Sequence, residues 1–253
     1  MTDIHTHVVF GVDDGSRSLE MSQEMLREAA EAGVTEICCT SHCRPGHRDF
    51  PRQAYEEHLA QLRAFLWEEG LEITLHPGCE IMYTSEAAAA ARTGAAPTLG
   101  GSGFVLLEFM PETPWGMMQH ALREMGNAGL QVLVAHVERY ACLRDEFSWL
   151  EEMKDLGATL QMNAQTVIRS QGFLGDRWAR KALKAGMIDI VASDMHNLTS
   201  RKPNMGEAWK VLKKELGEDR ARELVEETPH SILTSRVQRR RARRWQGRET
   251  GDR

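Results

Sequence analysis

Short apolar runs alternate with longer amphipathic stretches along the chain, and this alternation constrains the fold more than any other feature of the sequence. Seven runs have the length and residue types of buried strands, at residues 3–9, 36–40, 72–76, 105–109, 131–135, 159–163 and 188–192. Between them, apolar residues recur at helical spacing in residues 19–32, 52–69, 115–128, 144–156, 177–185 and 205–216.

Glycines mark the ends of most of the predicted helices. One glycine follows each of five predicted helices, where a left-handed residue lets the chain leave the helix: Gly33, Gly70, Gly129, Gly157 and Gly186. Buried strands that alternate with helices are typical of a parallel sheet. The sequence therefore predicts an α/β protein whose strands close as a parallel barrel, with an open doubly wound sheet as the alternative.

The net charge of −6 is unevenly distributed. Residues 236–253 contain eight arginines and two carboxylates, whereas residues 1–235 contain 23 basic and 35 acidic side chains, a net charge of −12. An acidic body argues against a general nucleic-acid binder, so no nucleic-acid partner is expected. We predict one domain over residues 1–235 and a basic tail over residues 236–253, either a solvated extension or a contact for a polyanion or membrane surface.

We expect neither an export signal nor a membrane-spanning segment in this protein. No apolar run approaches the roughly 18 residues that span a bilayer, so no integral membrane segment is expected. The first residues do not resemble a secretion signal. The five cysteines show no disulfide-like spacing, which favours reduced thiols. Together these features predict a cytoplasmic protein.

Nearly every predicted strand ends in a side chain that can bind a metal ion. The set comprises His5, His7, Asp14, His42, Glu80, Glu108, His136, Asp194 and His196. In a parallel barrel the C-terminal ends of all strands emerge on one face, so residues far apart in sequence converge there. His5 and His7 are two positions apart on a strand and therefore point to the same side, and Asp194 and His196 repeat this spacing.

Five histidines and four carboxylates on one face require cations between them, because buried charges are costly and like charges repel. Mixed nitrogen and oxygen ligands suit Zn, Mn, Fe or Co better than Ca. Nine ligands are too many for one ion, so we predict two or three divalent ions that share a carboxylate. Ions roughly 4 Å apart can clamp a phosphoryl group for in-line attack, which predicts a metal-dependent phosphoesterase.

Arginines follow two of the predicted ligands. Arg139 and Arg201 are predicted to grip phosphate oxygens, and surface salt bridges are the alternative for both. Arg44 is a further candidate. Cys38 and Arg44 also have the C-x5-R spacing of cysteine-dependent tyrosine phosphatases, but Cys38 falls inside a predicted strand, so we interpret the match as chance.

Several neighbouring polar residues have other predicted roles. Asp3 is expected to orient an imidazole without binding a metal. Either Asp13 or Asp14 can supply the ligand in the first loop, and the other then supports the loop before Gly15. The remaining histidines are expected to be solvated or structural: His47, His58, His76, His120 and His230.

As a set, these motifs resemble the PHP (polymerase and histidinol phosphatase) superfamily, and within it the bacterial tyrosine-protein phosphatases of the CpsB/YwqE/CapC group. The segments that carry the resemblance are DIHTHVVF at 3–10, VDDGS at 12–16, TSH at 40–42, EIMYT at 80–84, HVERY at 136–140 and SDMHNL at 193–198. The resemblance implies a distorted seven-stranded TIM-like (β/α)7 barrel, the PHP fold. It also implies a centre of three metal ions.

The resemblance further implies which ligands belong together. A first ion would bind His5, His7, Glu80 and Asp194; a second would share Glu80 and add Glu108 and His136; a third would bind Asp14, His42 and His196. Arg139 and Arg201 would hold the phosphate while metal-bound hydroxide hydrolyses phosphotyrosine. Among the metals, manganese is expected first. The loop at 43–48 departs from the usual basic stretch after the histidine, which bears on substrate preference.

The implied substrate is a phosphotyrosine protein, the C-terminal tail of a bacterial tyrosine kinase that controls capsule or exopolysaccharide synthesis. Whether the chain forms a homo-oligomer stays open. Three alternatives remain: a small-molecule phosphatase acting on a substrate such as histidinol phosphate, a nuclease, which the acidic body disfavours, and a non-catalytic metal-binding interaction module.

Overall fold

The computed structural model describes residues 1–171 and 175–235, so the predicted basic tail at 236–253 lies outside the described residues. Within them, strands form two sheets of orders β1-β2-β4 and β3-β5-β6-β7-β8-β9, and every pairing between neighbouring strands is parallel. The strands are β1 (Thr2–Thr6), β2 (Glu36–Cys39), β3 (His42–Cys43), β4 (Thr74–Pro77), β5 (Glu80–Met82), β6 (Phe104–Glu108), β7 (Gln131–Val134), β8 (Ala158–Asn163) and β9 (Ile190–Ala192).

The chain passes from the first sheet into the second at two short breaks. Two residues separate β2 from β3, and two separate β4 from β5. Gly78 lies in the second break, where a Cβ atom would lie 2.8 Å from the Cys38 Sγ atom. At the other side, Thr6 and Met195 form an isolated parallel bridge. The predicted α/β class with parallel strands is confirmed, whereas closure as a seven-stranded barrel stays a prediction.

Each predicted strand overlaps an observed one, although the ends differ. The first strand ends at Thr6 and not at residue 9, and the strands β3 and β5 are separate elements that the apolar pattern did not predict. Both of these short strands begin with a candidate ligand, His42 and Glu80, whose polar side chains interrupt the apolar runs. The sequence pattern therefore located the strands better than it located their ends.

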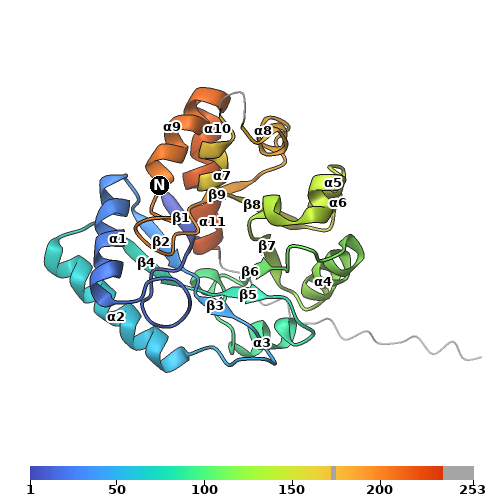
Figure 1. Cartoon of the computed structure of the whole chain (residues 1–253). Helices are drawn as coiled ribbons and strands as arrows, with labels where there is room; N and C mark the ends of the chain where they lie inside the picture. Colours follow the sequence, from blue (N-terminus) through green and yellow to red (C-terminus); the bar gives the residue numbers. More distant parts are fainter. Residues whose placement is uncertain (172–174, 236–253) are drawn as a thin grey trace, which may run out of the picture.

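Helices surround the strands (Figure 1). They are α1 (Leu19–Glu31), α2 (Arg52–Glu69), α3 (Ala87–Thr93), α4 (Trp115–Asn127), α5 (Ala141–Asp145), α6 (Trp149–Asp155), α7 (Ala164–Arg169), α8 (Arg177–Lys184), α9 (Met205–Leu216), α10 (Glu218–Arg222) and α11 (Thr228–Thr234), with short 3-10 turns η1 (Leu99–Gly101) and η2 (Val137–Arg139) and a π-helical turn η3 (Glu223–Glu227). None of the helices in the described residues is long and apolar enough to cross a bilayer.

One predicted helix is wrong. The stretch predicted as a single helix over 144–156 contains the end of α5 and all of α6, and the break lies between them. Glu146 has extended backbone angles, with φ −127° and ψ 100°. Its side chain accepts hydrogen bonds from both the backbone amide and the hydroxyl of Ser148. This local bonding competes with the helical pattern, and apolar spacing does not reveal it.

The glycine punctuation is confirmed. All five glycines predicted to end helices have left-handed backbones, with φ between 66° and 87°. At Gly70, for example, the backbone N–H donates to the carbonyls of Leu66 and Trp67 and so satisfies the end of α2.

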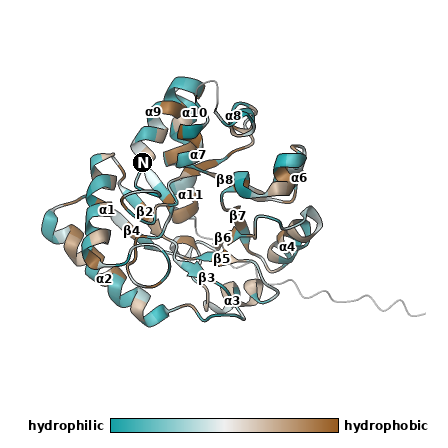
Figure 2. Ribbon diagram, viewed as in Figure 1, coloured by the Kyte–Doolittle hydropathy of each residue, from teal (hydrophilic) through white to brown (hydrophobic). Residues whose placement is uncertain are grey.

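A small apolar cluster lies on the strand face that carries Glu108. This cluster contains Leu106 and Ala192 together with Ile232 and Leu233 of α11. Because side chains alternate along a strand, Glu108 lies on the same face as Leu106. The opposite strand faces join a larger core with the helices, whose ribbons carry both hydrophobic and hydrophilic residues (Figure 2).

Candidate metal centre

The structure brings all nine candidate ligands together at the C-terminal ends of the strands. They form four overlapping groups in which the ligand atoms lie within 4.8 Å of one another: His7 with Asp14, His42 and His196; His5 with His7 and Glu80; His5 with His136 and Asp194; and His42 with Glu80 and Glu108. The overlap means that the groups form one site with several places for an ion.

Glu80, at the start of β5, lies at the centre of this site. Its Oε2 atom is 3.3 Å from His5 Nε2, 3.2 Å from His7 Nε2 and 3.1 Å from His42 Nδ1. Its Oε1 atom is 2.9 Å from His136 Nε2. A carboxylate that presents different oxygens to different imidazoles is placed to bridge two ions.

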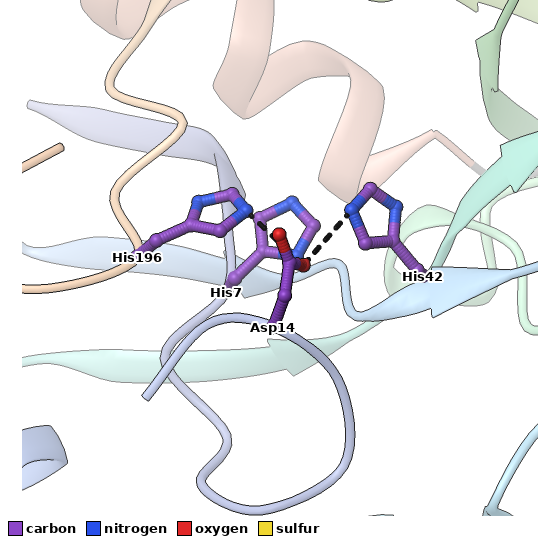
Figure 3. A group of neighbouring side chains, drawn as sticks. All are labelled: His7, Asp14, His42 and His196. Atoms are coloured by element: carbon purple, nitrogen blue, oxygen red, sulfur yellow. Dashed lines mark ion pairs between the residues drawn. The ribbon is translucent and has the colours of Figure 1, made fainter. Parts of the chain in front are cut away.

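Asp14 comes from the loop after β1 and points between two imidazoles (Figure 3). Its Oδ1 atom is 3.2 Å from His42 Nε2 and 3.6 Å from His196 Nε2. His7 completes this group of four. The side chain of Asp14 is 64% exposed. Of the four groups, this is the one that contains an exposed ligand.

Asp13 has the supporting role in the same loop. Its carboxylate accepts hydrogen bonds from the backbone amides of Gly15 and His42, and it lies 2.8 Å from His7 Nδ1. These contacts fix the loop and the orientation of the His7 ring, so that Nε2 faces the site. Of the two alternatives in the sequence, the geometry thus favours Asp14 as the ligand.

Asp3 is placed differently from the prediction. Its carboxylate accepts a hydrogen bond from the backbone amide of Ser193, so it holds the start of the loop that carries Asp194 and does not orient an imidazole. Burial raises the pKa of Asp3 to about 6. The prediction failed because Asp3 meets the Ser193 backbone amide, while Gln161 contacts the His5 ring.

The strand β8 supplies supporting residues that sequence reasoning missed. Gln161 Oε1 lies 3.2 Å from His5 Nδ1 and accepts a hydrogen bond from the His136 backbone amide. Asn163 donates to Asp194 Oδ2 at 2.8 Å. Both are polar residues on one face of a buried strand, two positions apart, and that spacing was the signal that could have identified them.

Two ligands have unusual backbones. His136 and Asp194 are the non-glycine residues with positive φ among the described residues, at 32° and 54°. For residues with a Cβ atom this region is sparsely populated, and such conformations concentrate at functional sites. Both follow the last residues of a strand, where the left-handed turn aims the side chain back toward the centre.

The electrostatics of the site favour positive charge. Burial disfavours protonated imidazoles, but Asp13 and Glu80 outweigh it and raise the pKa of His7 to about 10. Glu108 and Glu80 likewise raise the pKa of His136 to about 10 against its burial. The carboxylates thus draw cations to the site, either as protons on imidazoles or as metal ions that displace those protons.

The donor set fits divalent metal ions. Burial and the neighbouring His7 lower the pKa of His196 to about 2, which keeps this ring neutral. His196 Nε2 is buried without a hydrogen-bond partner among the described residues. A buried, neutral imidazole nitrogen without a partner is unusual in a folded protein unless it serves as a ligand.

Arg139 and Arg201 lie at the rim of the site. Arg201 Nη2 is 2.9 Å from Asp194 Oδ1, and Arg139 Nη1 is 3.9 Å from Asp194 Oδ2. Their side chains are 45% and 37% exposed, so both guanidinium groups have a ligand on one side and solvent on the other. This position allows either arginine to contact an anion that enters from solvent.

The remaining candidates lie outside the four ligand groups. Cys38 is fully buried, and burial raises the pKa of its thiol well above the usual value, which disfavours a nucleophilic thiolate. His58 contacts the carbonyl of Phe10, and His76 and His230 both contact Glu36. The cysteine-phosphatase alternative therefore lacks support from the geometry.

Comparison with known proteins identifies relatives across most of the chain. A family model for capsular polysaccharide synthesis proteins, CpsB/CapC, matches residues 1–234. The tyrosine-protein phosphatase CpsB of Streptococcus pneumoniae is 34% identical over 243 residues, which cover 94% of this chain and all of the relative. The tyrosine-protein phosphatase YwqE of Bacillus subtilis is 28% identical over 87% of this chain and 86% of its own length.

Solved structures agree with the sequence relatives. A crystal structure from work on YwqE of Bacillus subtilis and CpsB of Streptococcus pneumoniae, described as unique metal-dependent tyrosine phosphatases, superposes with a TM-score of 0.84. It shares 27% identity and covers 94% of this chain and 96% of its own. The Escherichia coli phosphotriesterase homology protein, at 13% identity and a TM-score of 0.57, shares the fold alone. The chain therefore belongs to the CpsB/CapC family of capsular polysaccharide synthesis proteins.

Proposed function

We propose that this chain is a metal-dependent protein-tyrosine phosphatase. The observation that carries the proposal is the set of four overlapping ligand groups centred on Glu80. Membership in the CpsB/CapC family and likeness to proteins named tyrosine-protein phosphatases support the choice of phosphotyrosine as the substrate. We assign the activity to one domain over residues 1–235, in which the seven strand segments form a distorted PHP-type barrel.

The proposed centre holds two or three divalent ions, with manganese as the first expectation and Fe, Zn or Co as alternatives. The ligand sets are His5, His7, Glu80 and Asp194 for one ion, Glu80, Glu108 and His136 for a second, and Asp14, His42 and His196 for a third. When bound, such ions neutralise charge on phosphoryl oxygens and lower the pKa of coordinated water. The proximity of His7 to both Asp14 and Glu80 supports an arrangement in which neighbouring ions share this part of the site.

Residues of the chain itself orient the phosphate. Arg139 and Arg201 lie on the solvent side of Asp194, where their guanidinium groups can hold phosphoryl oxygens in a fixed, bidentate geometry. The contact with Asp194 restrains Arg201 before substrate arrives, which lowers the entropic cost of binding. Glu80 and Asp194 are buried, so they stay in place while the phosphate is exchanged.

The substrate is a phosphotyrosine protein in the cytoplasm, and we expect a bacterial tyrosine kinase that controls capsule or exopolysaccharide synthesis. The description of the family supports the link to capsule synthesis. A phosphorylated C-terminal kinase tail is the form of substrate that we expect, because an extended segment can reach buried ligands more easily than a folded surface. A homo-oligomer is compatible with this function and is not required by it.

Chelation tests the proposal. Protein purified without chelator is analysed for bound metals and then assayed with a phosphotyrosine peptide before and after treatment with EDTA. We expect two or three divalent ions per chain, loss of turnover on chelation and recovery with Mn. Turnover that survives complete metal removal would overturn the proposal.

Substrate comparison separates the alternatives. A large preference for histidinol phosphate over the phosphotyrosine peptide would support a small-molecule phosphatase. Degradation of single-stranded DNA would support a nuclease. Absence of p-nitrophenyl phosphate hydrolysis in the Mn-loaded protein would support a metal-binding interaction module.

A further inference from the structure

Two adjoining hollows open beside the metal centre, with cavity volumes of about 400 and 330 Å³. Val12, Asp13, His42 and Arg48 line both of them. The first also reaches Asp14, and the second extends away from the ligands along the loop after β3, where it meets Arg44, His47, Asp49 and Pro51. A molecule at the metal centre can therefore continue into a space lined by the 44–51 loop.

The turn that carries the two arginines is held in place. The Arg48 backbone amide donates to the Arg44 carbonyl, and these two residues form an antiparallel bridge. Gly46 has a φ of +76°, which favours glycine at the tip of the turn. From the neighbouring segment, the Thr84 hydroxyl donates to the Pro45 carbonyl at 3.0 Å. The arginine backbones are therefore positioned before a ligand binds.

The charges of this turn are not used by the protein itself. Arg44 and Arg48 are exposed, and neither forms an ion pair with any residue that the structure describes. Among the carboxylates that line the second hollow, Asp13 is committed to His7 and to two backbone amides. Only Asp49 remains in this lining to offset the two guanidinium groups. The two guanidinium groups therefore face the hollow without an ion-pair partner among the described residues.

We propose that Arg44 and Arg48 form an anion subsite for the polypeptide substrate. It binds an anionic side chain near the phosphotyrosine, either a carboxylate of aspartate or glutamate or the phosphate of a second phosphotyrosine. Guanidinium groups bind both kinds of anion, and arginines on a fixed turn raise affinity for the correct partner. The inference rests on the proposed function, because it needs the phosphotyrosine at the metal centre to bring the neighbouring anion into the hollow.

Matched peptides test the subsite. Four phosphotyrosine peptides of equal length carry glutamate, glutamine, a second phosphotyrosine or an unphosphorylated tyrosine at the flanking positions. We expect the wild-type, Mn-loaded protein to prefer each anionic peptide over its neutral partner by about five- to tenfold in kcat/KM at low salt, mainly through KM. The preference should shrink as ionic strength rises, because exposed charges are screened.

The variant Arg44→Gln/Arg48→Gln should reduce that preference to less than about twofold. The ratio between paired peptides is the readout, so a general loss of folding or metal does not imitate the result. Arg123→Gln is the control, because Arg123 is an exposed arginine on α4 that lines neither hollow, and it should keep the wild-type ratio.

Binding separates failure of the subsite from failure of the proposed function. Peptides in which a phosphonate replaces the phosphate cannot be hydrolysed, and fluorescence anisotropy gives their Kd values. Tighter binding of anionic phosphonate peptides that the double variant loses would support the subsite even if no peptide were turned over. Equal Kd and kcat/KM values for anionic and neutral peptides, or an unchanged ratio in the double variant, would overturn it. A preference confined to glutamate or to the second phosphotyrosine identifies the natural anion.

Discussion

Histidines and carboxylates form two clusters, one at the C-terminal ends of the strands and one around Glu36 at the start of β2, with different results. At the C-terminal ends, nine such residues direct their ligand atoms toward one another. At the N-terminal ends, Glu36 lies beside Thr2 and Thr74 in the strand register and contacts two imidazoles. Glu36 Oε2 is 2.6 Å from His230 Nδ1, and Glu36 Oε1 is 3.3 Å from His76 Nε2.

The difference lies in convergence and burial. In the metal centre, Glu80 is 1% exposed and faces four imidazoles. In the second cluster, called here the lower trio, the side chains of Glu36, His76 and His230 are 19%, 20% and 53% exposed. The lower trio pairs each imidazole with one carboxylate oxygen and ties α11 to the first sheet. Residue type alone therefore does not define a metal centre, since the loops that follow parallel strands must also turn several ligands toward one point.

The largest expected contrast comes from removing the central carboxylate of each cluster. Glu80→Gln should lower p-nitrophenyl phosphate turnover by more than about a hundredfold, since even residues that only support metal ligands commonly contribute about 10- to 100-fold. Glu36→Gln should leave turnover within about twofold of wild type. Steady-state kinetics with saturating Mn measures turnover in both variants. Their Tm values show whether either variant is destabilised. Similar losses of turnover in both variants would remove the functional distinction between the two ends.

A smaller effect is expected from the residues that support the ligands. Gln161→Met keeps the side-chain volume but removes the oxygen that contacts His5 and the His136 amide. We expect metal affinity or turnover to fall by about 10- to 100-fold. His76→Gln, at the lower cluster, should leave metal content unchanged. Elemental analysis after dialysis against a weak chelator measures both, and full metal retention by Gln161→Met would show that this support is dispensable.

The smallest effect concerns stability and pH. Burial disfavours ionised Glu36, but the hydrogen bonds from His230 and Thr2 outweigh it and lower its pKa below the ordinary 4.5. The stabilisation by ionised Glu36 is therefore fully present above pH 4.5 and is lost as pH falls through the lowered pKa. Glu36→Gln should reduce the free energy of unfolding by at most about 1 kcal/mol, as for other partly exposed pairs. Urea denaturation at several pH values tests this, and a difference that grows toward low pH would contradict it.

Much of the site could be predicted because strand periodicity is local. The spacing of His5 and His7 places both rings on one side of a strand, and the apolar runs before Glu108 and His136 identify strand ends. The supporting residues could be identified only from the tertiary structure. Asp13 and Asp14 are adjacent in sequence and chemically identical, and only the path of the loop decides which one faces His42 and which one holds His7.

Local side-chain bonding also limited the prediction of the fold. The break between α5 and α6 depends on hydrogen bonds between Glu146 and Ser148, in a stretch whose apolar spacing is continuous. The left-handed backbones of His136 and Asp194 carry no sequence signal, because neither residue is glycine. Each is held by tertiary contacts, such as the hydrogen bond from the Asp194 amide to the His5 carbonyl.

By itself, the sequence determined the seven main strand segments and five of the longer helices, the glycines that end helices and the inventory of metal-binding side chains. These properties follow from patterns within a few residues, where 2-residue and 3.6-residue periodicities decide which side chains share a face. The tertiary structure alone decided that Glu80 faces four imidazoles, that Gln161 orients His5 and that Glu36 only joins two histidines. Those contacts join residues separated by up to 194 positions, so only the packed chain can select them.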